Sequence, residues 1–384
     1  MPNSLFVIYR CWTKPIVGVM LTILLFACGD QNQTVEKSEN TSSENSSAQA
    51  VERNLTFNDV ALEQSDRQGR PYWKVNAKEA TYSKDRRVAQ VQSPNGQLYQ
   101  DGKPLYYITA QSGEIEQDGE KLFLKGNIVA KDPARNLVLR GNELEWRPKQ
   151  ALLIVRNQVT GNNPQVQVVA KEAQVFSRAE RVELSGGVRA TSNDPSLQMR
   201  TEQVTWLIKT QKLISDRPIQ IDRYKDKKIT DRGTADQGEV NLKTNVATFK
   251  QNAQLSLLQP SMQITSNSLS WNMNTQIITA DQPVRIVDRQ QKTTVTANKA
   301  RMDVQKNVAY LTGNVKGNGQ QRQSLRANTL TWYIPTQNME ANGDVFYTQV
   351  NPAASFKGQK AVGNLQQQNI VVTGDRVLTE IVPQ

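Results

Sequence analysis

The chain has 384 residues, no histidine, two cysteines (Cys11 and Cys28) and a formal net charge of +11. Without histidine there is no Ser-His-Asp or Cys-His nucleophile pair, and two cysteines near the N-terminus leave the body without a disulfide framework or a Cys- or His-based metal site. The modest hydrophobic content of 37%, with abundant Gln, Asn, Thr and Val, favours exposed β-structure, and the positive charge favours an anionic partner.

Residues 1–27 have the pattern of a secretory signal. Arg10 and Lys14 precede an apolar run, PIVGVMLTILLFA, that is too short for a comfortable membrane span. The run closes as LLFACGD, which resembles a bacterial lipobox with Leu25 and Ala27 in the usual places, although Phe26 departs from the usual small residue. The resemblance implies cleavage before Cys28 and lipidation of its thiol; the alternative is an uncleaved signal anchor. Either route exports the body, so we expect a membrane-attached protein and no nucleic-acid partner.

Residues 28–53 read as a tether. After Cys28 the sequence GDQNQTVEKSENTSSENSSAQAVERN is rich in Ser, Asn, Glu and Gln and has almost no apolar residues. Such a composition cannot bury enough apolar surface to fold, so we predict a disordered linker between the lipidated cysteine and the body.

The body, from residue 54 on, is repetitive. Tryptophans stand at positions 146, 206, 271 and 332, spaced 60, 65 and 61 residues apart, and each sits in a short alternating segment. Successive strand residues point to opposite faces. Each tryptophan therefore shares one face with its second neighbours, whereas Glu145, Thr205, Ser270 and Thr331 share the other.

A second motif lies between the tryptophans. It reads LFLKGNIV, VELSGGV and AYLTGNV around Gly126, Gly186 and Gly313, and the copy expected near residue 250 has Gln251 in the glycine place. A glycine at a fixed place in a strand predicts a bulge, a bend or a close approach of two backbones. The repeat is therefore about 60 residues long and consists of two related halves.

These patterns predict an all-β fold of stacked antiparallel strands that adds stability rung by rung. Turn signals such as Asp132-Pro, Asn95-Gly and Asp281-Gln-Pro separate the alternating segments, and no amphipathic helix follows the signal. We expect an elongated body, either as one unit or as two in tandem, with segments at 54–200 and 201–384.

One apolar stripe recurs on the inward face of the predicted strands. In one interpretation it is a closed hydrophobic core; in the other, two splayed sheets leave a groove open to a lipid. The candidate groove residues are Leu144, Trp146, Val204, Trp206, Ile208, Leu269, Trp271, Met273, Leu330, Trp332 and Ile334. Tryptophan suits such a wall, because it combines a large apolar area with a polar N–H.

The segments LFLKGNIV, AYLTGNV and NGDV, behind an exported N-terminal anchor, resemble the OstA-like β-jellyroll of lipopolysaccharide transport proteins. The anchor with its body is similar to the LptC family, in an enlarged lipoprotein form. Two departures stand out: a usual member has one jellyroll and an uncleaved transmembrane helix.

The resemblance implies a periplasmic protein of a Gram-negative-type bacterium, lipid-anchored to a membrane, with the inner membrane favoured. Its expected partners are lipopolysaccharide, the subunits of an inner-membrane ABC transporter, and a bridging jellyroll. That bridge is an LptA-like protein or the N-terminal domain of the outer-membrane translocon. The N-terminal edge near Leu55 would face the transporter, and the C-terminal edge near Asn369 would accept the next jellyroll.

Two other functions compete with lipid transport. An enzyme acting on polysaccharide needs paired acids across a cleft, and Glu143 and Glu145 have no acidic counterparts in the other repeats. A structural surface lipoprotein would have the same fold with a closed core and no lipid cargo. We expect no enzyme, no cofactor and no metal site.

Overall fold

The computed structural model describes residues 55–84, 87–116, 121–364, 367, 369–374 and 376–381. These residues all lie in one compact unit, Arg53–Gln384. The predicted signal at 1–27, the candidate lipidation site Cys28 and the tether at 28–53 lie outside the described residues and stay predictions.

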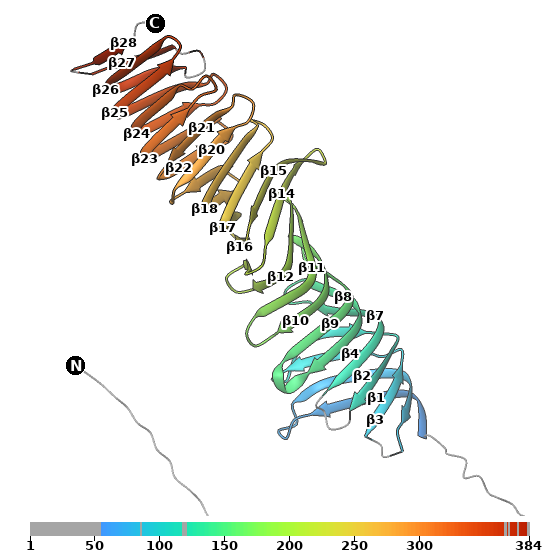
Figure 1. Cartoon of the computed structure of the whole chain (residues 1–384). Helices are drawn as coiled ribbons and strands as arrows, with labels where there is room; N and C mark the ends of the chain where they lie inside the picture. Colours follow the sequence, from blue (N-terminus) through green and yellow to red (C-terminus); the bar gives the residue numbers. More distant parts are fainter. Residues whose placement is uncertain are drawn as a thin grey trace, which may run out of the picture. The chain divides into compact units, whose positions relative to one another are not determined.

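The described part of the chain is all-β, as predicted, and its 28 strands form one sheet of antiparallel neighbours (Figure 1). The first strands are β1 (Leu55–Ser65), β2 (Pro71–Tyr82), β3 (Val88–Gln92), β4 (Asn95–Gln100), β5 (Lys103–Thr109), β6 (Ser112–Glu116), β7 (Leu122–Asp132), β8 (Leu137–Arg147), β9 (Leu152–Asn162), β10 (Val166–Phe176), β11 (Arg181–Asn193), β12 (Ser196–Leu207), β13 (Lys212–Ser215) and β14 (Ile219–Lys225). They continue with β15 (Lys228–Ala235), β16 (Gln237–Asn241), β17 (Val246–Leu257), β18 (Met262–Asn272), β19 (Ile277–Ala280), β20 (Val284–Asp288), β21 (Thr293–Ala297), β22 (Lys299–Asp303), β23 (Val308–Asn318), β24 (Ser324–Tyr333), β25 (Asn338–Val350), β26 (Ala353–Asn364), β27 (Asn369–Thr373) and β28 (Leu378–Ile381). A single 3-10 turn, η1 (Pro148–Gln150), interrupts them. Within the described ranges, no helix has the length and apolar content of a membrane span.

Each long strand bends near its middle and so contributes to two walls of the fold. At the bend of β7, the register shifts between Lys125 and Ile128, and the intervening Gly126 and Asn127 have φ values of 78° and 47°. Glycine occupies the same place in three further long strands, at Gly186, Gly313 and Gly343, with φ between 76° and 83°. The motif glycines therefore lie at the bends, where the register shifts, which is among the roles that the sequence predicted for them.

Short strands replace a bent long strand at several rungs. The turn signals Asp216-Arg-Pro and Asp281-Gln-Pro fall between β13 and β14 and between β19 and β20. Strand pairing still continues in both walls, because β12 pairs with β13 in one wall and with β14 in the other. Proline lacks an N–H, so it is found where the ladder of hydrogen bonds breaks.

The strands end in two rows of turns. The first turn row comprises residues 66–70, 101–102, 133–136, 163–165, 194–195, 226–227, 258–261, 289–292, 319–323 and 351–352, and the second comprises 148–151, 177–180, 208–211, 242–245, 273–276, 304–307 and 334–337. We call the strand segments between the first turn row and the bend the first wall, and those between the bend and the second turn row the second wall. Many turns begin with Asp or Asn, whose side chain accepts backbone N–H groups, as Asn272 does from Asn274 (3.1 Å) and Thr275 (3.0 Å).

Successive turns of the second turn row are joined by backbone hydrogen bonds. The amide of Ile208 donates to the carbonyl of Glu180 (2.9 Å), and that of Met273 donates to the carbonyl of Asn245 (2.9 Å). These bonds satisfy backbone groups that the end of a strand would otherwise leave unpaired, so rungs stack in register.

The inner faces of both walls form one continuous hydrophobic cluster that runs from β2 to β26. Three of its tryptophans, together with the partly buried Trp206 that packs against it, follow a single cross-strand row of the second wall. The row includes Leu122–Trp146–Leu153, Val182–Trp206–Leu213, Ala247–Trp271–Ile278 and Ala309–Trp332–Met339. Successive tryptophans are four rungs apart, roughly 19 Å at about 4.8 Å per strand. The predicted repeat is therefore a unit of four rungs.

The predicted boundary between residues 200 and 201 falls inside β12, and strand pairing continues on both sides of it. The division into two jellyroll segments stays a prediction. Trp73, outside the tryptophan row, is also buried, in β2 of the first wall.

Candidate functional site

The predicted groove residues all contribute to the inner face, but they differ in exposure. Leu144, Trp146, Val204, Leu269, Trp271, Met273, Leu330, Trp332 and Ile334 are at most 3% exposed, whereas Trp206 and Ile208 are partly exposed. The predicted alternation is also present, because Glu145, Thr205, Ser270 and Thr331 share an outer row of the second wall. Trp206 is thus the one predicted tryptophan that is not sealed in the core.

Around Trp206 the two walls separate into an apolar cleft. Its lining comprises Leu137, Leu139, Gly161, Asn163, Val166, Val168, Val182, Leu184, Ala190, Met199, Val204, Trp206, Leu213 and Leu242, with a continuation lined by Leu197, Ile221, Val240 and Met273. The cavity between these side chains has a volume of about 40 Å³. This volume is far below the roughly 300–1,000 Å³ that is usual for ligand pockets, so a bound chain would have to part the two walls further. We refer to this site as the apolar cleft.

Contacts between the two turn rows close the core on both sides of the apolar cleft. On the N-terminal side, Arg178 bonds Asp101 (3.0 Å), and Arg135 lies 3.5 Å from Glu180. On the C-terminal side, the side-chain amide of Gln337 donates to Asp288 (2.9 Å). Between these positions, no hydrogen bond or ion pair joins the two turn rows among the described residues. The cleft therefore lies in the segment that has no polar bridge between the turn rows among the described residues.

A further bridge on the N-terminal side joins the hydroxyls of Tyr106 and Ser177 (3.4 Å). Burial raises the pKa of Tyr106 to about 12, so its hydroxyl keeps its proton at neutral pH. The indole N–H of Trp146 also crosses the core, where it donates to the carbonyl of Tyr72 (3.3 Å). These two hydrogen bonds therefore cross the core on the N-terminal side of the apolar cleft.

The indole of Trp206 has an unused hydrogen-bond donor. Its Nε1 is buried and has no acceptor among the described residues, although the ring lines the apolar cleft. A buried N–H without a partner costs about 1–3 kcal/mol. An acceptor on a bound molecule, such as an ester or amide carbonyl, would remove this cost.

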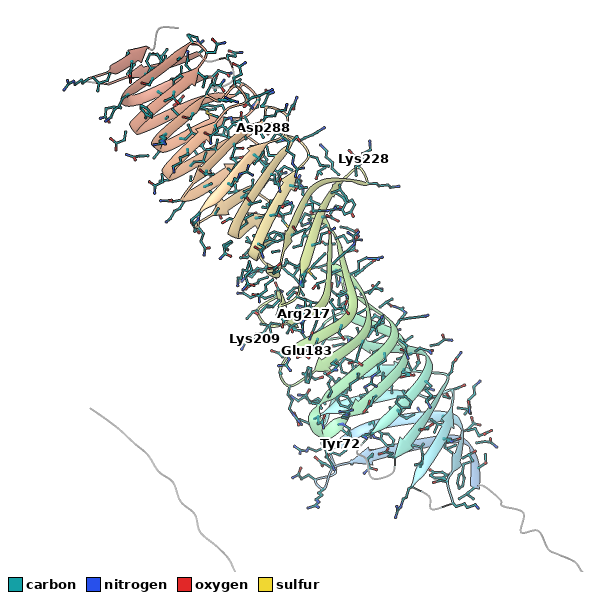
Figure 2. All side chains as sticks on the ribbon, in the orientation of Figure 1. Tyr72, Glu183, Lys209, Arg217, Lys228 and Asp288 are labelled. Carbon is teal, nitrogen blue, oxygen red and sulfur yellow. The ribbon has the colours of Figure 1, made fainter. Side chains whose placement is uncertain are left out.

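Charged residues lie at the first-turn-row side of the cleft. Asp231 on the inner face is buried beside Arg223 (3.4 Å), and burial raises the pKa of its carboxyl. The tip of the hairpin between β14 and β15 bears Lys228, which Figure 2 shows projecting from the ribbon. These charged residues therefore lie beyond Ile221, at the continuation of the cleft, and outside its apolar lining.

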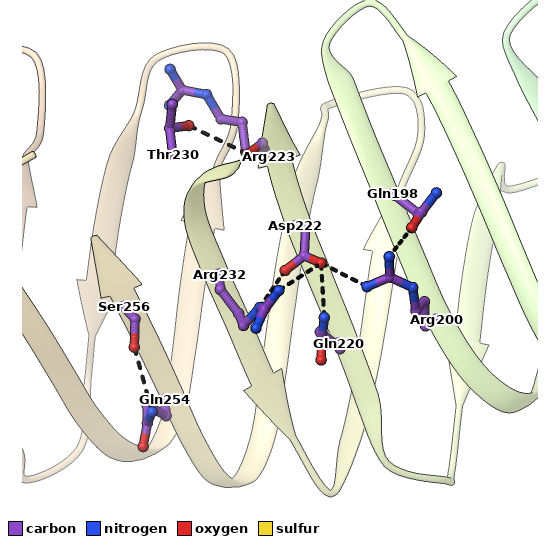
Figure 3. A network of polar contacts seen from close by, with 9 residues as sticks. All are labelled: Gln198, Arg200, Gln220, Asp222, Arg223, Thr230, Arg232, Gln254 and Ser256. Atoms are coloured by element: carbon purple, nitrogen blue, oxygen red, sulfur yellow. Dashed lines mark hydrogen bonds and ion pairs between the residues drawn. The ribbon is translucent and has the colours of Figure 1, made fainter. Parts of the chain in front are cut away.

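The outer face of the same strands has a separate network (Figure 3). Asp222 accepts from Arg200 Nη1 (2.8 Å), Arg232 Nε (2.6 Å) and Gln220 Nε2 (2.8 Å). Burial alone would raise the pKa of Asp222, but these hydrogen bonds and the charge of Arg232 outweigh it and hold the pKa below its usual value. The network ties β12, β14 and β15 together behind the cleft.

Glu145, one of the two acids considered for an enzymatic site, is held in ion pairs. Its carboxylate bonds Arg147 (2.6 Å) and Arg156 (3.0 Å). Burial raises its pKa, but the two arginines outweigh this effect and lower the pKa, which does not suit a general acid. In the described ranges, no three acidic, His or Cys side chains form a cluster that could hold a metal.

The sequence analysis missed the half of the cleft that the first wall supplies. Leu137, Leu139, Val166, Val168 and Met199 belong to it, and none of them lies near a repeated motif. Their signal is short apolar alternation beside a turn. That signal predicts a buried strand, but not a cleft, because the cleft depends on which turns are bridged.

The chain matches the family described as "Lipopolysaccharide-assembly, LptC-related" over residues 17–152, 152–227 and 220–318. Comparison with curated individual proteins found no match. The three matched segments together cover most of the bent strands and all of the apolar cleft. With its all-β body of stacked rungs, the chain belongs to the LptC-related family, which takes part in lipopolysaccharide transport.

Proposed function

We propose that the protein holds the acyl chains of lipopolysaccharide in the apolar cleft and passes them from an inner-membrane ABC transporter to a periplasmic bridging jellyroll. The observation that carries the proposal is the apolar cleft, open around Trp206 and continuous with the core on both sides. Membership of the LptC-related family, which is a transport rather than an enzyme family, supports it.

The energetics favour such a site. Exposing an acyl chain of about a dozen methylenes to water costs about 10 kcal/mol, at roughly 0.8 kcal/mol for each methylene. From β8 to β14 the cleft crosses five strand spacings, or roughly 24 Å. One leaflet of a bilayer's hydrocarbon core is about 15 Å thick, half of the full core. The cleft is therefore long enough for such a chain, which would have to part the walls to enter, because the cavity between them is about 40 Å³.

The edges of the sheet suit transfer to other proteins. Among the described strands, β1 pairs with β2 alone, and β27 and β28 pair with β26 alone. Leu55 and Phe57 on β1 are each 44% exposed. Unpaired edges of this kind accept a strand from a partner. We assign the β1 edge to the transporter and the β27–β28 edge to the bridging jellyroll, in a periplasmic protein anchored through Cys28.

Photo-crosslinking in living cells tests the lipid site. A photoreactive residue at Trp206 or Met199 faces the cleft and should capture lipopolysaccharide, whereas one at Thr205 faces outward and should not. Met199 is the safer position, since a flexible side chain tolerates replacement. Equal labelling of the two faces, or no lipid at either cleft position in normally exported protein, would contradict the proposal.

A structural lipoprotein without cargo is the second candidate. It is favoured by the complete burial of Trp146, Trp271 and Trp332, each at most 1% exposed. Organic extraction of the freshly purified body separates the two functions: recovered lipopolysaccharide supports transport, and an empty extract supports a scaffold.

A further inference from the structure

The outer face of the first wall has a row of positive charge that the repeats do not reveal. Strand register places one residue from each rung opposite the next in a continuous cross-strand line. This line, the basic row, contains Asn76, Asn95, Thr109, Val129, Arg140, Thr160, Val169, Arg189, Arg200, Gln220, Thr234, Gln254, Thr265, Arg285, Thr296, Lys316, Arg326, Phe346, Lys357 and Leu378. It holds Arg and Lys repeatedly and neither Asp nor Glu.

The corresponding outer row of the second wall has the opposite character. It contains Thr81, Gln90, Glu114, Phe123, Glu145, Ile154, Gln174, Glu183, Thr205, Ile214, Glu239, Thr248, Ser270, Thr279, Arg301, Tyr310, Thr331, Glu340, Val362 and Val371. Its acids are numerous, and Arg301 is its sole cation. Cations in the neighbouring rows of the second wall pair with these acids, as Arg147 and Arg156 do with Glu145. The basic row has no acids of its own, so its excess charge points to an anionic partner for the first wall.

The cations of the basic row are largely available. Arg200 is bound to Asp222, whereas Arg285, Lys316, Arg326 and Lys357 are exposed and have no ion pair with any described residue. These four lie within five strand spacings, or roughly 24 Å. Because no described carboxylate forms an ion pair with these four cations, they can pair with a bound anion.

The same face is hollowed beside Arg285 and Lys316. The hollow has a volume of about 1000 Å³ and is lined by Asn252, Ala253, Gln254, Thr265, Ser266, Asn267, Pro283, Val284, Arg285, Thr296, Ala297, Asn298, Asn314 and Lys316. Apart from its two cations, the polar lining consists of amides and hydroxyls, and none of the lining residues is acidic. Amide and hydroxyl groups donate and accept hydrogen bonds, as sugar hydroxyls require, and the cations pair with phosphate.

We infer that this hollow binds a phosphate-bearing saccharide, with Arg285 and Lys316 on the phosphate and the Asn, Gln and Thr side chains on the sugar. A hollow suits a single saccharide better than a membrane surface, which needs a flat or convex face. The site lies on the opposite side of the first wall from the cleft, because Val284 and Ile286 beside Arg285 are buried in the core. The inference therefore goes beyond the proposed acyl-chain site and does not depend on it.

Calorimetry with a soluble sugar tests the inference. The probe is the phosphorylated core oligosaccharide of lipopolysaccharide after complete deacylation, titrated into the full body. The double variant Arg285→Gln/Lys316→Gln should weaken its binding by roughly tenfold or more for each cation removed. Dephosphorylated oligosaccharide should bind the unaltered protein correspondingly less well, and added salt should weaken the phosphorylated complex.

The matched control is Lys299→Gln/Arg301→Gln, which removes the same charge from the exposed outer face of the second wall. It should leave binding unchanged. An equal loss in this control, no binding of the phosphorylated probe, or binding of anionic vesicles in place of the sugar would each overturn the inference. Because the probe has no acyl chains, crosslinking at Trp206 is independent of the result.

Discussion

Two consecutive residues with left-handed backbone mark the bend in β7, β9, β11, β17, β23 and β25. Four of these bends begin with glycine, but β9 uses Asn157 and Gln158, with φ values of 62° and 60°, and β17 uses Gln251 and Asn252, with φ values of 61° and 51°. A residue with a Cβ pays about 1–2 kcal/mol for this conformation. The sequence repeat already marked Gln251 as the exception, and the structure shows the same bend without the usual residue.

We therefore predict that Gln251→Gly stabilises the protein by roughly 0.5–1 kcal/mol, since the relief of strain exceeds the added entropy of the unfolded chain. Urea denaturation followed by circular dichroism measures the change. Ser256→Gly, at an ordinary extended position of β17, is the control and should destabilise by about 0.5–1 kcal/mol. A destabilising Gln251→Gly would show that the bend does not strain the native chain.

Replacing a bend glycine by a residue with a Cβ should lower the stability of the protein. At Gly313, φ is 78° and an added Cβ would lie 2.9 Å from Nδ2 of Asn298 on the neighbouring rung. The glycine therefore avoids both the strain of this backbone conformation and a close contact with the Asn298 side chain. For this reason the repeated LxGN motifs predict where the strands bend, although each copy is short.

At the scale of elements, the register of strands decides which side chains meet. The alternation around each tryptophan was readable from the sequence, because it is local to one strand. The basic row and the Asp222 network could not be read from the sequence. Arg200 lies beside Asp222 only because the chain breaks between β13 and β14 and β14 then pairs with β12. The apolar cleft was missed for a similar reason, since contacts such as Asp101–Arg178 join turns that lie far apart in sequence.

The Asp222 network should make the pairing of β12, β14 and β15 depend on pH. The folded-state pKa of Asp222 is lowered, so its ionised form stabilises the fold above the unfolded-state pKa of about 3.9. That contribution is lost as the pH falls through the lower folded-state value. We predict that Asp222→Asn reduces stability at pH 7 and that the difference from the unaltered protein disappears in strong acid. Urea titrations over a pH series measure it.

Asp231 on β15 provides a control of opposite sign. Burial raises its folded-state pKa, so its contribution to stability is present at low pH and is lost as the pH rises through that value. Asp231→Asn should therefore cost little or increase stability at pH 7. Parallel losses in both variants would mean that packing, rather than charge, governs the two sites.

At the scale of the whole molecule, stability should come from neighbouring rungs rather than from one central core. The hydrophobic cluster is continuous, but each rung pairs only with the rungs beside it. Such an architecture permits removal of a whole repeat if register and facing are preserved. The segments QVTWLIKTQKLISDRPIQI and SLSWNMNTQIITADQPVRI give two equivalent places to join the chain.

Deletion of residues 207–271 tests this property, because it joins Trp206 to Asn272 and so replaces one tryptophan rung by its equivalent. In β12, Thr201 pairs with Ile219, and in β18 the equivalent Ser266 pairs with Val284, each five residues before its tryptophan. The hybrid strand, which consists of residues 196–206 followed by Asn272, therefore meets β19 and β20 in the native register. We predict a soluble β-rich protein with one cooperative thermal transition. Deletion of 207–270 keeps one residue more, so every later side chain would point to the wrong face and the protein should aggregate. Equal behaviour of the two deletions, measured by circular dichroism and gel filtration, would show that the rungs are not interchangeable units.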